Sequence, residues 1–102
     1  MGRIVRQTDR DEDRLTTGQR LSWLMRDRGV TAKGLAANLR IQESTLGNFR
    51  GGYRSIPSDV VAGMARELST NVDFLLERSE DARPGEVIEE EARTRMEARR
   101  GR

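Results

Sequence analysis

The sequence predicts a single small all-α domain followed by a charged helical tail. Apolar residues recur at spacings of three and four in several short segments, which is the period of a helix with one buried face. Helix-starting and helix-ending residues separate these segments, and no stretch alternates apolar and polar residues as a half-buried strand does. With 102 residues, of which 34% are hydrophobic and 35% charged, one domain can form a core while part of the chain stays outside it.

We divide the chain into three parts. Residues 1–14 are charged and lack periodicity, so we expect a flexible N-terminal arm. Residues 15–78 carry the periodic segments and are expected to form the domain itself. The composition shifts sharply after Ser79, and residues 79–102 are expected to be a linker followed by a highly charged helical tail.

Two short helices are expected at the start of the domain. The first begins at Thr16 or Thr17, both good cap residues, and runs to Arg28. Gly29 is well placed to end it in the left-handed conformation, and Thr31 then caps the second helix. The residues expected to face the core from these helices are Leu21, Leu24, Met25, Leu35, Ala36 and Leu39.

The third and fourth helices follow after a tight connection. The third is expected to begin at Gln42 or Glu43 and to end at the glycine pair 51–52. The fourth spans residues 58–69, with Ser58 as its cap. Its apolar stripe consists of Val60, Val61, Met64, Ala65 and Leu68.

The fifth helix completes the expected domain. Asn71 is expected to cap a helix over residues 72–78 that covers the core with Val72, Phe74 and Leu75.

The segment EDARPG, residues 80–85, is typical of a linker, and residues 86–100 form the charged helix. This helix has acidic residues early and basic residues late, which favours it through the helix dipole. Two i,i+4 ion pairs are expected within it, Glu89 with Arg93 and Glu91 with Arg95. The apolar stripe of this helix is narrow, which leaves two interpretations open. The helix is either marginally stable and exposed, and becomes ordered by packing on a second subunit, or it is a dimerisation element. The stripe consists of Val87, Ile88, Ala92 and Met96.

Composition argues against several classes of function. The chain has no cysteine and no histidine, so disulfides, thiolate sites and the commonest general base and metal ligand are missing. No segment combines a nucleophile, a base and a cleft motif, so no enzyme, catalytic residue, metal or cofactor is expected. No apolar run reaches the length of a membrane span, and the start of the chain lacks the apolar stretch of a signal peptide. We therefore expect a cytoplasmic protein without a membrane partner.

Positive charge is concentrated in one part of the chain. The net charge is only +2, but residues 15–56 carry six arginines and Lys33 against Asp27 and Glu43, a balance of +5. A basic face on an otherwise balanced protein favours a polyanionic partner.

The second and third expected helices, joined by a tight turn, have the arrangement of a helix-turn-helix. The DNA major groove admits one helix, whose side chains must be short and able to donate or accept hydrogen bonds. A strongly charged helix would bind phosphates but discriminate sequence poorly. Residues 42–50 fit the first description, because their outward positions are polar and lightly charged.

Residues 19–76 resemble the Cro and lambda-repressor-like helix-turn-helix family. The resemblance lies in LSWLMRDRGVTAKGLAANLRIQESTLGNF and in SIPSDVVAGMARELSTNVDFLL. It implies a five-helix lambda-repressor-like bundle, here with a charged C-terminal helical tail. It also implies a sequence-specific DNA-binding transcription regulator, most typically a phage or prophage-type repressor.

The chain departs from the family pattern at four places. Ala32 stands where members usually have a glutamine that contacts the DNA backbone, and Arg40 stands where many have glycine. Arg50 precedes the glycine pair where a Glu-X-Gly sequence is frequent, which adds a positive charge. Thr70 replaces a usual valine, for which we expect a modest loss of packing.

The resemblance also implies the site residues. Those expected to read bases are Glu43, Ser44, Gly47 and Asn48. Those expected to bind phosphates are Lys33, Arg40, Gln42, Arg50, Tyr53 and Arg54. Two structural alternatives stay open: Glu43 can simply complement the helix dipole, and Gly47 can be a tolerated weak point of its helix. For each phosphate candidate, a solvated surface role is the alternative.

Two functional hypotheses follow. In the first, the protein regulates transcription by binding double-stranded operator DNA, as a homodimer on a two-fold site, and an antirepressor or another protein partner relieves it. In the second, it is an antitoxin-like or adaptor protein-interaction module that uses the same bundle or its tail. A steep loss of DNA affinity with rising salt would separate the first from the second.

Overall fold

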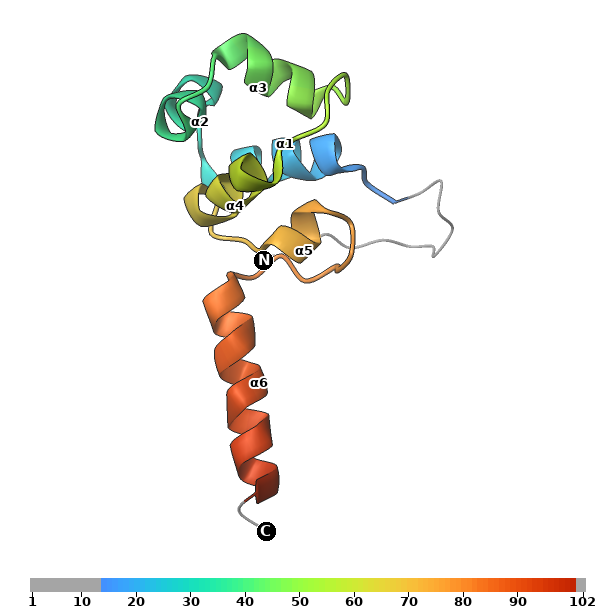
Figure 1. The fold of residues 1–102 in the computed structure, drawn as a ribbon, viewed down its shortest axis with the longest axis vertical. Coiled ribbons are helices and arrows are strands. Elements are labelled where there is room, and N and C mark those ends of the chain that lie inside the picture. The colour runs from blue at the N-terminus through green and yellow to red at the C-terminus, as the bar shows by residue number, and fades with distance from the viewer. Residues whose placement is uncertain (1–13, 101–102) are drawn as a thin grey trace.

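The computed structural model describes residues 14–100, and its regular secondary structure within that range is entirely helical. The elements are α1 (Thr17–Arg28), α2 (Ala32–Leu39), α3 (Glu43–Arg50), α4 (Ser58–Glu67), α5 (Val72–Leu75) and α6 (Gly85–Arg100). The first five pack into a bundle, and α6 extends away from it along the long axis of the molecule (Figure 1). The predicted all-α class is confirmed. The arm predicted for residues 1–14 lies, apart from Arg14, outside the described residues.

Most predicted helix ends are confirmed, because they depend on local hydrogen bonds. The Thr16 hydroxyl accepts from the Gln19 amide and the Gln19 side chain accepts from the Thr16 amide, which forms a capping box. The side chains of Thr31 and Asn71 cap α2 and α5, each accepting one hydrogen bond from the amide three residues later. Gly29 adopts the left-handed conformation that ends α1, with φ of 66°.

Three expectations about helix ends are wrong. Pro57 rather than Ser58 precedes α4 as its cap residue, and no side-chain bond caps this helix. The fourth and fifth helices end at Glu67 and Leu75, earlier than expected, and residues with left-handed backbone follow each of them. Ser69 has φ of 51° and Glu77 has φ of 66°, conformations that cannot continue a right-handed helix.

The core contains the apolar faces of α1 to α5 together with two residues beyond them, Leu68 and Ala82. Its buried members are Leu21, Leu24, Met25, Leu35, Ala36, Leu46, Phe49, Val61, Met64, Ala65, Leu68, Phe74, Leu75 and Ala82. Leu39 and Val60 pack on this cluster as half-buried residues. Val72, expected in the core, is exposed instead, because the single turn of α5 directs Phe74 and Leu75 inward.

Arg20 in α1 is a buried charge that the sequence did not predict. The side chain is 1% exposed and lies against the ring of Phe74, with the guanidinium carbon 4.7 Å from the ring centre. Its Nε donates to the carbonyl of Leu15, and Nη1 donates to the carbonyls of Phe74 and Ser79 at 3.0 and 2.8 Å. Nη2 donates to the carboxylate of Glu80 at 2.8 Å. One side chain thus joins the start of α1, the end of α5 and the segment that follows α5.

Residues 79–84, here called the strap, are docked on the bundle rather than forming a free linker. Ala82 is fully buried, and its carbonyl accepts a hydrogen bond of 2.8 Å from the Thr70 hydroxyl. The side-chain amide of Asn71 donates to the carbonyls of Asp81 and Arg83. Thr70 is therefore no packing loss, because a valine could not donate this bond.

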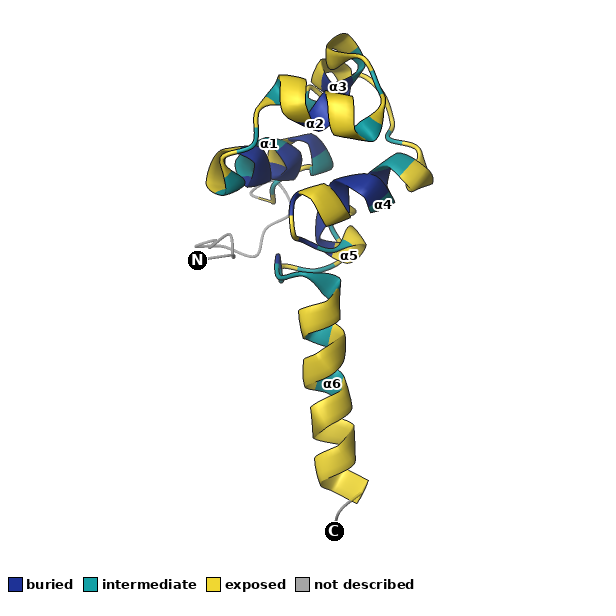
Figure 2. Cartoon of the chain, turned by 90° about the vertical axis from the view of Figure 1, so that its left-hand side faces the viewer, coloured by how far each residue is buried: buried dark blue, intermediate teal, exposed yellow. Residues whose placement is uncertain are grey.

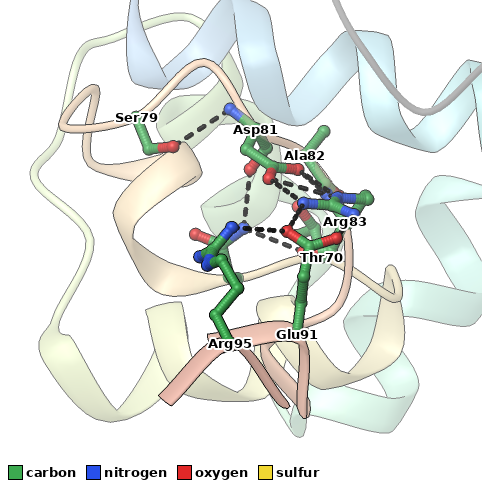
Figure 3. A network of polar contacts seen from close by, with 8 residues as sticks. Thr70, Ser79, Asp81, Ala82, Arg83, Glu91 and Arg95 are labelled. Carbon is green, nitrogen blue, oxygen red and sulfur yellow. Dashed lines mark hydrogen bonds and ion pairs between the residues drawn. The ribbon is translucent and has the colours of Figure 1, made fainter. Parts of the chain in front are cut away.

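Arg83 connects the strap to α6 (Figure 3). Its guanidinium donates to both carboxylate oxygens of Asp81 and to both of Glu91. The Arg83 hydrogen bonds and its charge hold the pKa of Glu91 below its ordinary value. Glu91 also forms the predicted pair with Arg95 at 3.6 Å.

The remainder of α6 is solvated. None of its residues is buried, and its surface is exposed along nearly its whole length (Figure 2). The predicted pair of Glu89 with Arg93 is not formed; Arg93 pairs with Glu90 at 2.8 Å, three residues away on the same helix. Within residues 14–100, no helix has the length and apolar character needed to cross a membrane.

We expect Arg20→Met to lower the free energy of unfolding by about 1–3 kcal/mol, the range for leaving buried acceptors without their donor. The substitution keeps an apolar stem but leaves the carbonyls of Phe74 and Ser79 without their donor. Urea denaturation measures the change. Arg26→Met, at an exposed position of the same helix, is the control and should change stability by less than about 0.5 kcal/mol. Equal midpoints for the two variants would contradict the role of Arg20.

Candidate nucleic-acid interface

The outer face of α3 is the surface to which the sequence assigns DNA binding. Leu46 and Phe49 of α3 are buried, and the helix packs on α1 and α2. The three residues 40–42 join α2 to α3, with Arg40 in the left-handed conformation (φ 58°). In both views α3 lies at the end of the molecule opposite α6 (Figures 1 and 2).

The position of α3 on α1 depends on Gly18. A Cβ atom at this residue would lie 2.3 Å from the carbonyl oxygen of Arg50 and 2.9 Å from that of Phe49, so only glycine fits. The Arg50 side chain adds a hydrogen bond of 3.0 Å from Nε to the hydroxyl of Ser22. These contacts fix the C-terminal end of α3 against the first turns of α1.

Sequence interpretation missed Gly18 and Ser22. A glycine inside an otherwise helical segment was the available signal for the first, because it indicates a close backbone approach. No comparable signal marks Ser22, since its role depends on a residue 28 positions away.

The four residues predicted to read bases lie together and are all exposed. Glu43, Ser44, Gly47 and Asn48 occupy the outer side of α3. The space beside Gly47 is open, with no heavy atom within 4 Å of the position that a Cβ atom would occupy. The Ser44 hydroxyl is 3.4 Å from the side-chain oxygen of Gln42, the residue that precedes the helix. The described part of the chain therefore leaves this face uncovered.

The predicted phosphate-binding residues lie in α2, in its connection to α3, at the end of α3 and just after it, and all but one of them are exposed. Lys33, Arg40, Gln42, Tyr53 and Arg54 are exposed, and Tyr53 is 85% exposed. Arg50 is half-buried and directed in part toward Ser22, so it supports α3 as well as contributing charge. The Arg54 guanidinium lies 6.0 Å from the centre of the Phe49 ring, which places it near the end of α3.

Besides Arg50, two of the seven cations in residues 15–56 serve the fold. Arg20 is buried, as described above. Arg28 donates from Nε to the carbonyl of Leu68 at 2.9 Å and from Nη2 to the carbonyl of Ala82 at 3.3 Å, and it pairs with Asp27. The excess of positive charge in this part of the chain is thus smaller on the α3 side than the sequence count implies. The cations there are Lys33, Arg40, Arg50 and Arg54, against the single carboxylate of Glu43.

We expect Gly18→Ala and Gly47→Ala to have opposite effects on stability. The first places a methyl group against backbone atoms and should cost about 1–3 kcal/mol, as overpacking does. The second adds a methyl group in open space and should stabilise the helix by up to about 1 kcal/mol. Denaturant unfolding of both variants measures the difference, and equal signs would contradict the described packing of α3.

A scan against protein-family models and a search of curated proteins found no match to this chain. The function is therefore inferred from the residues of the site and their geometry. The surface of α3, with its polar outer face and flanking cations, is the best-defined candidate in the described chain.

Proposed function

We propose that the protein is a sequence-specific DNA-binding transcription regulator of the Cro and lambda-repressor-like helix-turn-helix type, with α2 and α3 as the motif. A single observation carries the proposal: α3 presents short polar side chains and a glycine on a face that residues 14–100 leave uncovered, and the segments before and after it carry exposed cations. A repressor of the phage or prophage kind is the form that the sequence resemblance favours.

The dimensions and chemistry of α3 suit the major groove. A helix with its side chains is about 10–12 Å across, and the groove is about 12 Å wide. Asn48 can bond the adenine edge in two places, and Glu43 can accept from the amino group of cytosine. The open space at Gly47 lets the backbone of α3 come close to a base pair.

The flanking residues supply affinity rather than specificity. Lys33 lies in the first turn of α2, and Arg40 is the first residue of the connection between α2 and α3. Arg54 and Tyr53 follow the C-terminal end of α3. Such groups bind phosphates and orient the helix in the groove, and each neutralised phosphate makes binding more sensitive to salt.

A separate observation supports the second candidate, a protein-interaction module. Helix α6 stands outside the bundle with no buried residue, and such a helix gains stability when a partner covers it. An antitoxin-like or adaptor role would use this helix, and an antirepressor could bind there while α3 binds DNA. DNA reading and partner binding then occupy opposite ends of the molecule.

We expect Asn48→Ala and Lys33→Ala to weaken DNA binding in different ways. Loss of Asn48 should remove about 1–3 kcal/mol of discrimination at one base position and leave the salt dependence unchanged. Loss of Lys33 should weaken binding to all sequences about equally and reduce the slope of log affinity against log salt by about 1.

Selection from random duplexes, followed by titration of each variant at several salt concentrations, measures both effects. The control is Glu97→Ala in α6, an exposed residue at the end of the molecule opposite α3 (Figure 1), which should change neither quantity. Recovery of no preferred sequence by the unsubstituted protein would overturn the proposed function.

A further inference from the structure

The charge distribution of helix α6 is complementary to that of a second α6 that runs in the opposite direction. Its first half, residues 85–92, carries four carboxylates and no cation, and its second half, residues 93–100, carries four arginines and one carboxylate. A parallel pair of such helices would place carboxylates against carboxylates, whereas an antiparallel pair places each acidic half against a basic half. The helix dipole explains the order of charges in one helix, but the same order also specifies the direction of a pair.

One face of α6 continues from a crevice at its junction with the bundle. The crevice, of about 560 Å³, lies where α6 leaves the bundle and is lined by Asn71 and Val72 of the bundle and by Gly85, Glu86 and Glu89 of α6, among others. Residues three or four positions apart lie on the same face of a helix. The face that includes Gly85 and Glu89 therefore continues through three further residues. Those residues are Ala92, Met96 and Arg100.

We call this row of five residues the crevice face. The side chain at the middle of this face, Ala92, is small and allows close approach of another helix. Met96 on the same face is 56% exposed. None of the residues on this face is buried, and Glu89, Met96 and Arg100 are exposed. A 16-residue charged helix that stands alone in water is only marginally stable. A partner that packs on this face would stabilise the helix.

We infer that the crevice face pairs antiparallel with the crevice face of a second copy of this chain. With the two-fold axis at the helix midpoint, Ala92 lies at the crossing and Glu89 lies between Arg93 and Arg100 of the second copy. The basic C-terminal end of the second α6 then reaches the mouth of the crevice, whose charged lining residues are Glu86, Glu89 and Arg66 and are net negative. The helices overlap over about 24 Å, so the interface is short and the association reversible.

The pairing has a consequence that rests on the proposed function. Since α3 lies at the end of each molecule opposite α6, an antiparallel pair directs the two α3 surfaces away from each other (Figures 1 and 2). Such a dimer would bridge two DNA segments rather than occupy neighbouring turns of one straight duplex.

Sedimentation equilibrium of the full chain without DNA tests the pairing. Glu89→Arg and Arg100→Glu should each raise the dimer dissociation constant at least tenfold, and an equimolar mixture of the two should recover much of the affinity. Glu97→Arg is the control, because it makes the same charge change at an exposed position of the same helix that lies off the crevice face. It should leave the constant within threefold. An unsubstituted chain that stays monomeric at every concentration, or a mixture without recovery, overturns the proposal.

Cysteine crosslinking tests the direction, and the absence of native cysteine makes single variants unambiguous. Ala92→Cys should form a disulfide-linked dimer under mild oxidation, whereas Met96→Cys should not, because an antiparallel pair separates its two copies by about 10 Å along the helix. Crosslinking of both variants would indicate a parallel pair and contradict the inference.

Bridging of two differently labelled duplexes tests the consequence for DNA. The unsubstituted chain should bring the duplexes together, and Glu89→Arg should bind each duplex but not bridge them. Failure to bind any duplex, with dimerisation intact, would reject the proposed function and leave the pairing in place. Dimerisation with DNA binding but without bridging would reject the opposed arrangement of the α3 surfaces.

Discussion

The buried guanidinium of Arg20 is the interaction on which the arrangement of the chain depends. A charge removed from water is stable only when its donors are satisfied, and Arg20 finds its partners at three separate segments. Leu15 precedes α1, Phe74 belongs to α5, and Ser79 begins the strap. The hydrogen bonds of this one side chain therefore hold the two ends of the bundle together.

The strap extends this organisation toward α6. Thr70 and Asn71, at the junction of α4 and α5, bind its backbone carbonyls, and Arg28 at the end of α1 adds another contact. Arg83 then ties the strap to the second turn of α6 through Glu91. The direction in which α6 leaves the bundle thus follows from polar contacts, since no apolar side chain of α6 is buried. Because these contacts lie at the far end from α3, the molecule keeps its two exposed surfaces structurally separate.

Features that depend on interactions between nearby residues could be predicted from the sequence, whereas features that depend on residues far apart in the chain could not. The caps at Thr16, Thr31 and Asn71 and the left-handed Gly29 depend on residues within one helical turn, so the sequence indicated them correctly. The buried Arg20 depends on carbonyls 54 and 59 residues away, which no local pattern contains, so its sequence context does not distinguish it from a surface charge. The strap resembles a free linker in sequence for the same reason.

The candidate site shows the same division. The outward face of α3 could be predicted, because helical periodicity separates Leu46 and Phe49 from the polar residues between them. The support beneath it could not, since the contact of Gly18 with the carbonyl of Arg50 joins two segments that are far apart in the chain. Periodicity also identified α6 as a helix, but its ion pairs depend on side-chain conformation: Arg93 pairs with Glu90 rather than with Glu89.

The central claim is that the outer face of α3 contacts the edges of bases. Nuclear magnetic resonance of the labelled protein, titrated with a duplex chosen by selection, measures this directly through the amide signals of residues 43–48 and the side-chain amide of Asn48. We predict that these signals shift together and saturate with the duplex, while the amides of the last two turns of α6 do not respond. Shifts concentrated on α6, with those of α3 unchanged, would contradict the claim.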